Sequence, residues 1–229
     1  ASGVLNTDWI WCTMFADYDN DGYKDLFITN GYLRDYTNKD FLTYWGDYKL
    51  QKAINREPFK LMDLIRAMPS TTLDNYIFRN NHDLTFTNMK EKWGMNIPGI
   101  SSGAIYADLD NDGDLDLVVN RINSNAAVYK NMEMEQQQGN YLAIKLKYKN
   151  PNVNAIGAKL YLYNGSNKQY LEVNPNHGYL SCVSTTAHFG LGDLKIVDSL
   201  RIIWPNHTSE IIKNIQGNQM LHVEYNSAS

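Results

Sequence analysis

The chain has 229 residues, 43% of them hydrophobic, so it is long enough for two domains that each bury a core. Its formal net charge is only −4, and no run of basic residues points to nucleic acid. No apolar stretch approaches the roughly 20 residues that a membrane-spanning helix needs, so no transmembrane segment is expected. The two cysteines, Cys12 and Cys182, lie far apart in the chain and do not indicate a disulfide framework.

Residues 10–30 predict a strand, an acidic loop and a second strand. An aromatic and β-branched run leads into the loop, and Leu26-Phe27-Ile28-Thr29 follows it. Carboxylates at alternate positions of a tight turn converge on one point and supply the oxygens that Ca²⁺ prefers. Gly22 permits the bend, and Tyr23 would add its backbone carbonyl. The acidic ligands predicted for this first loop are Asp17, Asp19, Asp21 and Asp25.

The segment after this unit changes character. Residues 37–69 predict a helical insertion, with Asn38 as an N-cap, a second helix starting near Pro58 and an end at Pro69. Residues 76–78 and 84–86 then predict a β-hairpin. The helices are therefore inserted between elements of a β-structure.

Residues 104–120 repeat the strand–loop–strand pattern of residues 10–30, with residues 15–22 aligned to residues 106–113. An EF-hand would need a Glu at loop position twelve and flanking helices, whereas the two loops have Ile28 and Val119 there and β-branched flanks. Acidic turns without metal are the alternative, but their close carboxylates would repel one another. We therefore predict two Ca²⁺ sites. The second comprises the side chains of Asp108, Asp110, Asp112 and Asp116 with the carbonyl of Asp114.

A polar segment at residues 132–139 predicts a linker, and the rest reads as a second β-domain. Leu142, Ile144 and Leu146 alternate with Lys145 and Lys147, the period of a half-buried strand. Short alternating runs separated by Gly and Asn favour an antiparallel sandwich or barrel-like domain. Three glycines are expected in turns with close backbone approach: Gly157, Gly190 and Gly192.

Residues 15–31 and 104–120 resemble FG-GAP/VCBS-type repeats, the calcium-loop blades of integrin-like β-propellers. Five later segments, in order, resemble the ASPIC/UnbV domain: residues 140–142, 154–158, 178–181, 188–192 and 197–205. The resemblance implies a mainly β fold, with propeller blades over residues 1–131, the helical insertion at about 37–69, and an ASPIC/UnbV β-domain over 140–225. Because propellers close with typically 4–8 blades, two repeats imply the C-terminal part of a larger, Bacteroidetes-type cell-surface protein.

No nucleophile with a base can be assembled, the five histidines lack zinc-site spacing, and the carboxylates that a glycosidase needs are mostly committed to calcium. We expect a non-catalytic, extracytoplasmic binding or adhesion module, at the cell surface, associated with the outer membrane or secreted, with a protein or glycan partner. The alternative is a structural accessory subunit of an outer-membrane, nutrient-uptake-type complex. A carbohydrate-active enzyme is the less favoured reading, and no ligand-binding residues are assigned.

Aromatic residues are abundant, with 16 Tyr, 5 Trp and 7 Phe, and aromatic platforms bind sugars or peptides. Most are expected in the core. Trp9 and Trp11 precede the first acidic loop at alternate positions of a strand. The aromatic residues that follow that loop and are candidates to line an exposed face are Tyr32, Tyr36, Tyr44 and Trp45.

Overall fold

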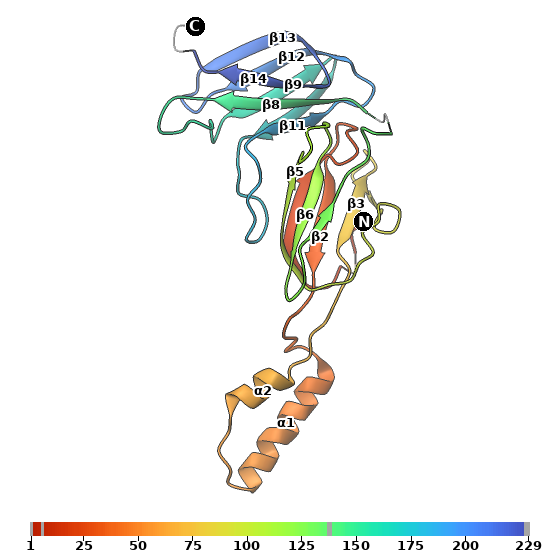
Figure 1. The fold of residues 1–229 in the computed structure, drawn as a ribbon, viewed down its shortest axis with the longest axis vertical. Coiled ribbons are helices and arrows are strands. Elements are labelled where there is room, and N and C mark those ends of the chain that lie inside the picture. Colours follow the sequence, from red (N-terminus) through yellow and green to blue (C-terminus); the bar gives the residue numbers. More distant parts are fainter. Residues whose placement is uncertain (1, 6, 137–138, 227–229) are drawn as a thin grey trace.

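A computed structural model describes residues 2–5, 7–136 and 139–226. The described residues are mainly β, as predicted, and form an elongated molecule in three tiers (Figure 1). A pair of small sheets occupies the middle, the C-terminal domain lies at one end and a helical arm projects from the other. Of the predicted linker, residues 137 and 138 lie outside the described part of the chain.

The first sheet is an antiparallel meander in the order β1-β2-β3-β4. Its strands are β1 Ile10–Ala16, β2 Asp25–Asn30, β3 Tyr76–Asn80 and β4 Phe86–Asn88. The last two form the predicted hairpin. Every residue of β2 is buried, because the strand lies between β1 and β3 and packs against β5 of the next sheet.

The second sheet has the order β5-β6-β7, with β5 Ser101–Ala107, β6 Asp116–Arg121 and β7 Ala127–Tyr129. It repeats the first in detail, because Ala16 pairs with Asp25 just as Ala107 pairs with Asp116. Both strand pairs also contain a register shift near their far end, between Ile10 and Thr13 and between Ser101 and Ala104. The internal repeat read from the sequence is thus a repeat of backbone geometry.

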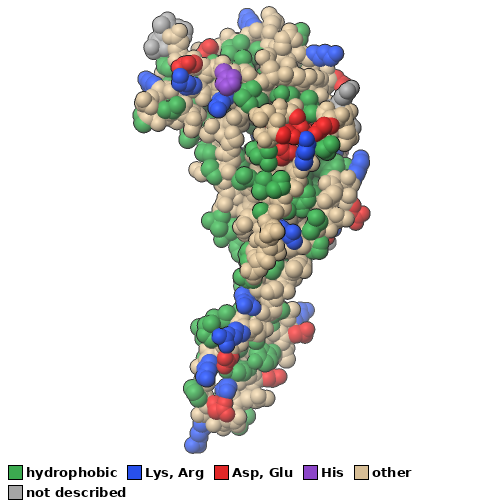
Figure 2. All heavy atoms as spheres, in the orientation of Figure 1, with side chains coloured by type: hydrophobic (Ala, Val, Ile, Leu, Met, Phe, Trp, Pro, Cys, Tyr) green, Lys and Arg blue, Asp and Glu red, His purple; other side chains and the backbone are tan. Residues whose placement is uncertain are grey.

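The helical arm consists of α1, Lys39–Ile54, and α2, Leu61–Ala67. Asn38 caps α1 as predicted, since its side chain accepts a 3.0 Å hydrogen bond from the backbone N–H of Phe41. The second helix begins at Leu61 rather than near Pro58, because the chain is still extended at Lys60. Only one residue in each helix is buried, and hydrophobic and charged side chains intermingle on the face of the arm in Figure 2.

The C-terminal domain packs two sheets around its own hydrophobic core, as a sandwich and not a closed barrel in the described residues. One sheet has the order β10-β9-β12-β13 and the other β11-β8-β14. The strands are β8 Tyr141–Lys147, β9 Lys159–Asn164, β10 Asn167–Glu172, β11 Ala187–Gly190, β12 Ile196–Ile203, β13 Ser209–Gln216 and β14 Gln219–Glu224. The alternation in β8 is confirmed, since Leu142, Ile144 and Leu146 are buried and Lys145 and Lys147 are exposed.

One pairing departs from the antiparallel pattern expected for this domain, because β14 runs parallel to β8. The sequence places only Gly217 and Asn218 between β13 and β14, a spacing typical of a hairpin. The two strands nevertheless belong to different sheets, so this short connection is a corner that carries the chain across the sandwich. The crossing brings β14 alongside β8 in the parallel sense.

Candidate metal centre

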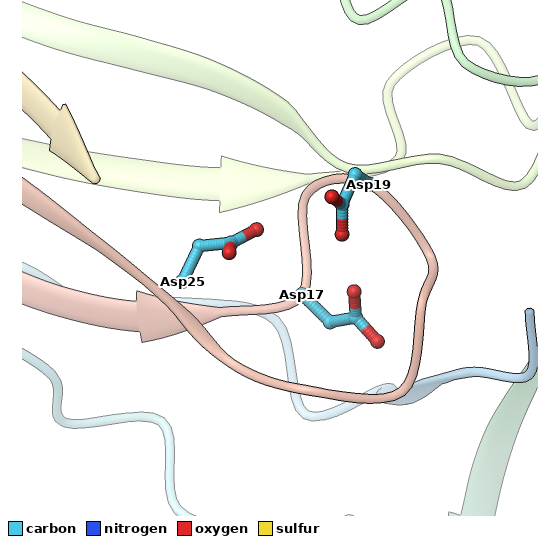
Figure 3. Close-up of side chains that lie close together, drawn as sticks. All are labelled: Asp17, Asp19 and Asp25. Atoms are coloured by element: carbon cyan, nitrogen blue, oxygen red, sulfur yellow. The ribbon is translucent and has the colours of Figure 1, made fainter. Parts of the chain in front are cut away.

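The first acidic loop connects β1 to β2 and folds around its own carboxylates. Asp17, Asp19 and Asp25 each offer an oxygen within 4.8 Å of the others, and Figure 3 shows these side chains around the space that the loop encloses. The Asp17 carboxylate accepts hydrogen bonds from the backbone N–H groups of Asp21, at 3.1 Å, and Gly22, at 2.8 Å. Asp17, the first aspartate of the acidic motif, therefore holds the loop in its bent form.

The second acidic loop connects β5 to β6 with the same geometry. Asp108 accepts from the backbone N–H groups of Asp112 and Gly113, both at 3.2 Å. The carboxylates of Asp108, Asp110 and Asp116 lie within 4.8 Å of one another. Gly22 and Gly113 occupy equivalent left-handed positions, with φ of 93° and 102°, which explains why both loops have Gly there.

The last aspartate of each motif ties its loop to two other segments. Asp25 accepts from the N–H of Tyr18, at 3.1 Å, and from the N–H of Asn80 at the end of β3, at 2.9 Å. Asp116 likewise accepts from Leu109, at 2.9 Å, and from Asn131, at 2.8 Å. Asp25 thus ties the first loop to the end of β3, and Asp116 ties the second loop to the segment just after β7.

Burial of several carboxylates makes both loops electrostatically unfavourable by themselves. Burial, reinforced by the neighbouring aspartates, raises the pKa of Asp17 well above its ordinary value and that of Asp25 to about 7. In the second loop burial raises the pKa of Asp114 to about 7. Three buried carboxylate oxygens of the loops have no hydrogen-bond partner among the described residues: Asp19 Oδ1, Asp112 Oδ2 and Asp114 Oδ1. A cluster of oxygen donors with unsatisfied atoms fits a hard divalent cation such as Ca²⁺.

A basic residue that the sequence analysis missed accompanies each loop. Arg79, in β3, pairs with Asp19 and Asp21, at 2.5 and 3.3 Å. Lys130, just after β7, pairs with Asp110 at 2.5 Å and also contacts Glu135. In the sequence, each of these basic residues stands in an aromatic–basic–Asn tripeptide, at residues 78–80 and 129–131. The correspondence is hard to see because the inserted arm makes the distance in sequence from loop to tripeptide much longer in the first unit than in the second.

The remaining predicted ligands lie around these clusters. The Asp21 side chain is held by Arg79 and by His82, whose Nε2 is 2.7 Å from Asp21 Oδ2, and Asp112 groups with Asp110 and Glu135. The ring of Tyr23 stacks on His82 at 3.8 Å between centroids. Asp114 contributes more than the predicted carbonyl, because its buried carboxylate accepts a 3.1 Å hydrogen bond from the N–H of Met134.

The first loop is also the point where both sheets meet the C-terminal domain. Asn20, fully buried at its tip, donates a 3.1 Å hydrogen bond from Nδ2 to the carbonyl of Gly113 in the second loop. Its Oδ1 lies 2.7 Å from His188 Nε2 in β11, and its carbonyl accepts a 2.7 Å bond from the N–H of Gly192. Gly190, expected in a turn, ends β11 and faces Asp17 so closely that a Cβ there would lie 2.0 Å from Asp17 Oδ2. The conformation of the loop and the docking of the domain are therefore coupled.

A cleft of about 890 Å³ opens beside this junction, between the first loop and the C-terminal domain. Its walls include Asp21 and Tyr23 from the loop, Tyr106 from β5, and Gln169 and His177 from the C-terminal domain. Clefts of this size at domain boundaries commonly hold small ligands. The edge of the first loop thus faces solvent-accessible space.

Two protein-family models match parts of the chain. Residues 60–119 match an FG-GAP-like repeat, and residues 148–229 match the ASPIC and UnbV family. No curated protein matches the chain. The second acidic loop lies within the repeat match, and the first lies outside it but has the same backbone geometry. Neither helix in the described residues is long and apolar enough to cross a bilayer.

Proposed function

For a chain that combines an FG-GAP-like repeat with an ASPIC/UnbV domain, we propose a calcium-stabilised binding module that acts outside the cytoplasm and has no catalytic activity of its own. The observation that carries the proposal is the duplicated loop. Each copy gathers three carboxylates within 4.8 Å, and buried oxygens without a partner occur in both. Such a donor set favours Ca²⁺, which takes six to eight oxygen ligands.

The chain's own residues give the metal a structural role. Asp17 and Asp108 already hold the loop backbone, Asp25 already holds the end of β3, and Asp116 already holds the segment just after β7. A bound cation would remove the repulsion between these carboxylates and so stabilise the sheets and the docking surface for the C-terminal domain. This role requires no open coordination position and no substrate.

Two arguments support a site of action outside the cytoplasm. FG-GAP-like repeats are typical of extracellular proteins. Calcium sites of extracellular modules bind with Kd of about 10⁻⁴–10⁻³ M, which millimolar calcium keeps occupied. Arg79 and Lys130 partly neutralise the loops without metal, which favours affinities in this weak range over the tight sites of cytosolic buffers.

The projecting arm favours a second candidate, a structural subunit of a larger surface complex of the nutrient-uptake type. Several large hydrophobic side chains of the arm are exposed, among them Leu50, Ile54, Leu61 and Met62. Exposed hydrophobic surface on a projecting element is typical of an interaction site when its residues are contiguous. Purification from the native membrane tests this candidate, because a stoichiometric partner would support it and a monomeric product would oppose it.

Isothermal titration calorimetry with Ca²⁺ on the chelator-treated full chain tests the main proposal. We expect two binding events, one of which disappears in Asp17→Asn and the other in Asp108→Asn. The matched control is Asp47→Asn, since Asp47 is an exposed acidic residue of α1 far from both loops. At a concentration 100 times Kd, each ion should stabilise the fold by about 2.7 kcal/mol. No calcium binding by the unmodified chain would refute the proposal.

A further inference from the structure

Five aromatic rings form a continuous group where the first sheet, the base of the arm and the C-terminal domain meet. Trp9 lies 6.3 Å from Trp11, 5.6 Å from Tyr32 and 6.4 Å from Tyr36, measured between ring centroids. Trp11 in turn lies 5.2 Å from Tyr179. We name these five residues the aromatic platform. We propose that the aromatic platform binds a neutral saccharide chain, an inference that rests on the proposed binding role and specifies its ligand.

The C-terminal domain completes the platform through a long connection. The chain between β10 and β11 leaves that domain and runs alongside β5 (Figure 1). There Ser181 Oγ accepts a 3.0 Å hydrogen bond from the N–H of Ala104 in β5. A Cβ on Gly103 would lie 2.9 Å from the carbonyl oxygen of Leu180, so the two backbones are in close contact. Tyr179 is therefore held in place beside Trp11 by contacts at the two residues that follow it.

The polar groups of the two inner rings form hydrogen bonds, whereas those of the three outer rings form none within the described part of the chain. The indole N–H of Trp11 donates to the carbonyl of Gly31 at 2.8 Å, and the Tyr32 hydroxyl donates to Asp8 Oδ1 at 3.2 Å. The outer rings, Trp9, Tyr36 and Tyr179, are 41%, 52% and 44% exposed. Among the described residues, none forms a hydrogen bond with the indole N–H of Trp9 or with the hydroxyls of Tyr36 and Tyr179. The platform thus combines fixed ring faces with three free polar groups at its rim.

This combination matches the chemistry of a pyranose chain. The C–H groups on the face of a sugar ring pack on an aromatic ring, and the hydroxyls at its edge would satisfy the Trp and Tyr polar groups. A purely apolar partner surface would bury those polar groups without hydrogen-bond partners, which is unfavourable.

The acidic residues near the aromatic platform favour a neutral saccharide over an anionic one. Burial raises the pKa of the Tyr32 hydroxyl to about 12, and the hydrogen bond to Asp8 and the negative charges of Asp8 and Asp35 contribute to that rise. An anionic polysaccharide would be repelled by this pair.

Affinity electrophoresis of the full chain tests the inference, in gels that contain glucomannan, xylan, pullulan or dextran, with polygalacturonate as the anionic comparison. We expect at least one neutral polysaccharide to retard the chain and polygalacturonate not to. Trp9→Ala and Tyr179→Ala should each weaken the retardation by tenfold or more. Tyr44→Ala is the matched control, because Tyr44 is an equally exposed aromatic residue that lies on α1, outside the platform.

Three results would overturn the inference: no retardation by any neutral polysaccharide, equal losses in Tyr44→Ala and Trp9→Ala, or binding of a lysine-rich peptide in place of saccharide. Calcium-dependent melting of each variant is recorded in parallel. If the unmodified chain shows the expected calcium-dependent melting but binds no saccharide, only the saccharide inference is refuted. If it binds saccharide but calcium does not change its melting, only the proposed role of calcium is refuted.

Discussion

Gly190→Ala tests whether the C-terminal domain presses on the first acidic loop. The added methyl carbon would lie 2.0 Å from Asp17 Oδ2, 2.6 Å from the carbonyl carbon of Asn20 and 2.7 Å from its Cα. The Asp17 side chain can turn away, but the Asn20 backbone is held by hydrogen bonds on both sides of the junction. Overpacking of this kind costs about 1–3 kcal/mol. If the loop shifts to relieve the strain, its calcium affinity should fall by roughly 5- to 150-fold, since 1.4 kcal/mol corresponds to tenfold.

Thermal unfolding and calcium calorimetry on the same preparation measure the two effects. Gly217→Ala is the matched control, because Gly217 lies in the same domain and its nearest new contact would be the flexible end of Leu191, at 3.1 Å. We expect Gly190→Ala to melt at lower temperature and to lose affinity at the first loop alone, with the second loop unchanged. A variant that melts like the unmodified chain and retains both calcium sites would show that the domain does not constrain the loop.

Three further predictions concern the arm, the counter-charge and the C-terminal domain. Arg79→Met removes the cation that pairs with Asp19, so the calcium-free chain should lose up to about 1 kcal/mol and the rise in melting temperature on adding Ca²⁺ should become larger; an unchanged rise would argue against competition between Arg79 and the metal. Gly46→Ala, inside α1 with open space around it, should stabilise that helix by about 0.5–1 kcal/mol and slow amide hydrogen exchange in residues 39–54; faster exchange would contradict the helix. Residues 140–225 expressed alone should give a β-type circular dichroism spectrum and a cooperative melt, because their hydrophobic core is self-contained, and a disordered product would mean that docking is required for folding.

Patterns confined to about ten residues were readable from the sequence. The two Asp-rich motifs, the Gly at their sixth positions and the flanking β-branched runs gave the loops and their strands, and the alternation in residues 142–147 gave the buried face of β8. Asn38 as a helix cap follows from the same local chemistry, since the cap bonds to an amide three residues away. The start of α2 was misplaced because Pro58 permits a helix start without requiring one.

Contacts between residues far apart in the chain were decided by the tertiary structure. Arg79 reaches Asp19 across 60 positions, and the tripeptide that contains Arg79 does not by itself show which carboxylate it meets. Asn20 meets His188 across 168 positions, and no local pattern marks that pair. The two-residue connection at Gly217 has the length of a hairpin, and only packing across the sandwich makes it a corner that sets β14 parallel to β8.

The sequence by itself determined that this chain carries two acidic loops between strands, followed by a β-domain with its own core, because the spacing of carboxylates, glycines and apolar residues is fixed within each element. It also supplied Tyr32 and Tyr36 of the aromatic platform as candidates for an exposed face, but together with Tyr44 and Trp45, which the structure places on α1. Which rings gather was settled by docking: the connection between β10 and β11 lies along β5 and brings Tyr179 to Trp11. That contact depends on the close fit of two backbones at Gly103, a property of the packed surfaces that residue type alone does not reveal.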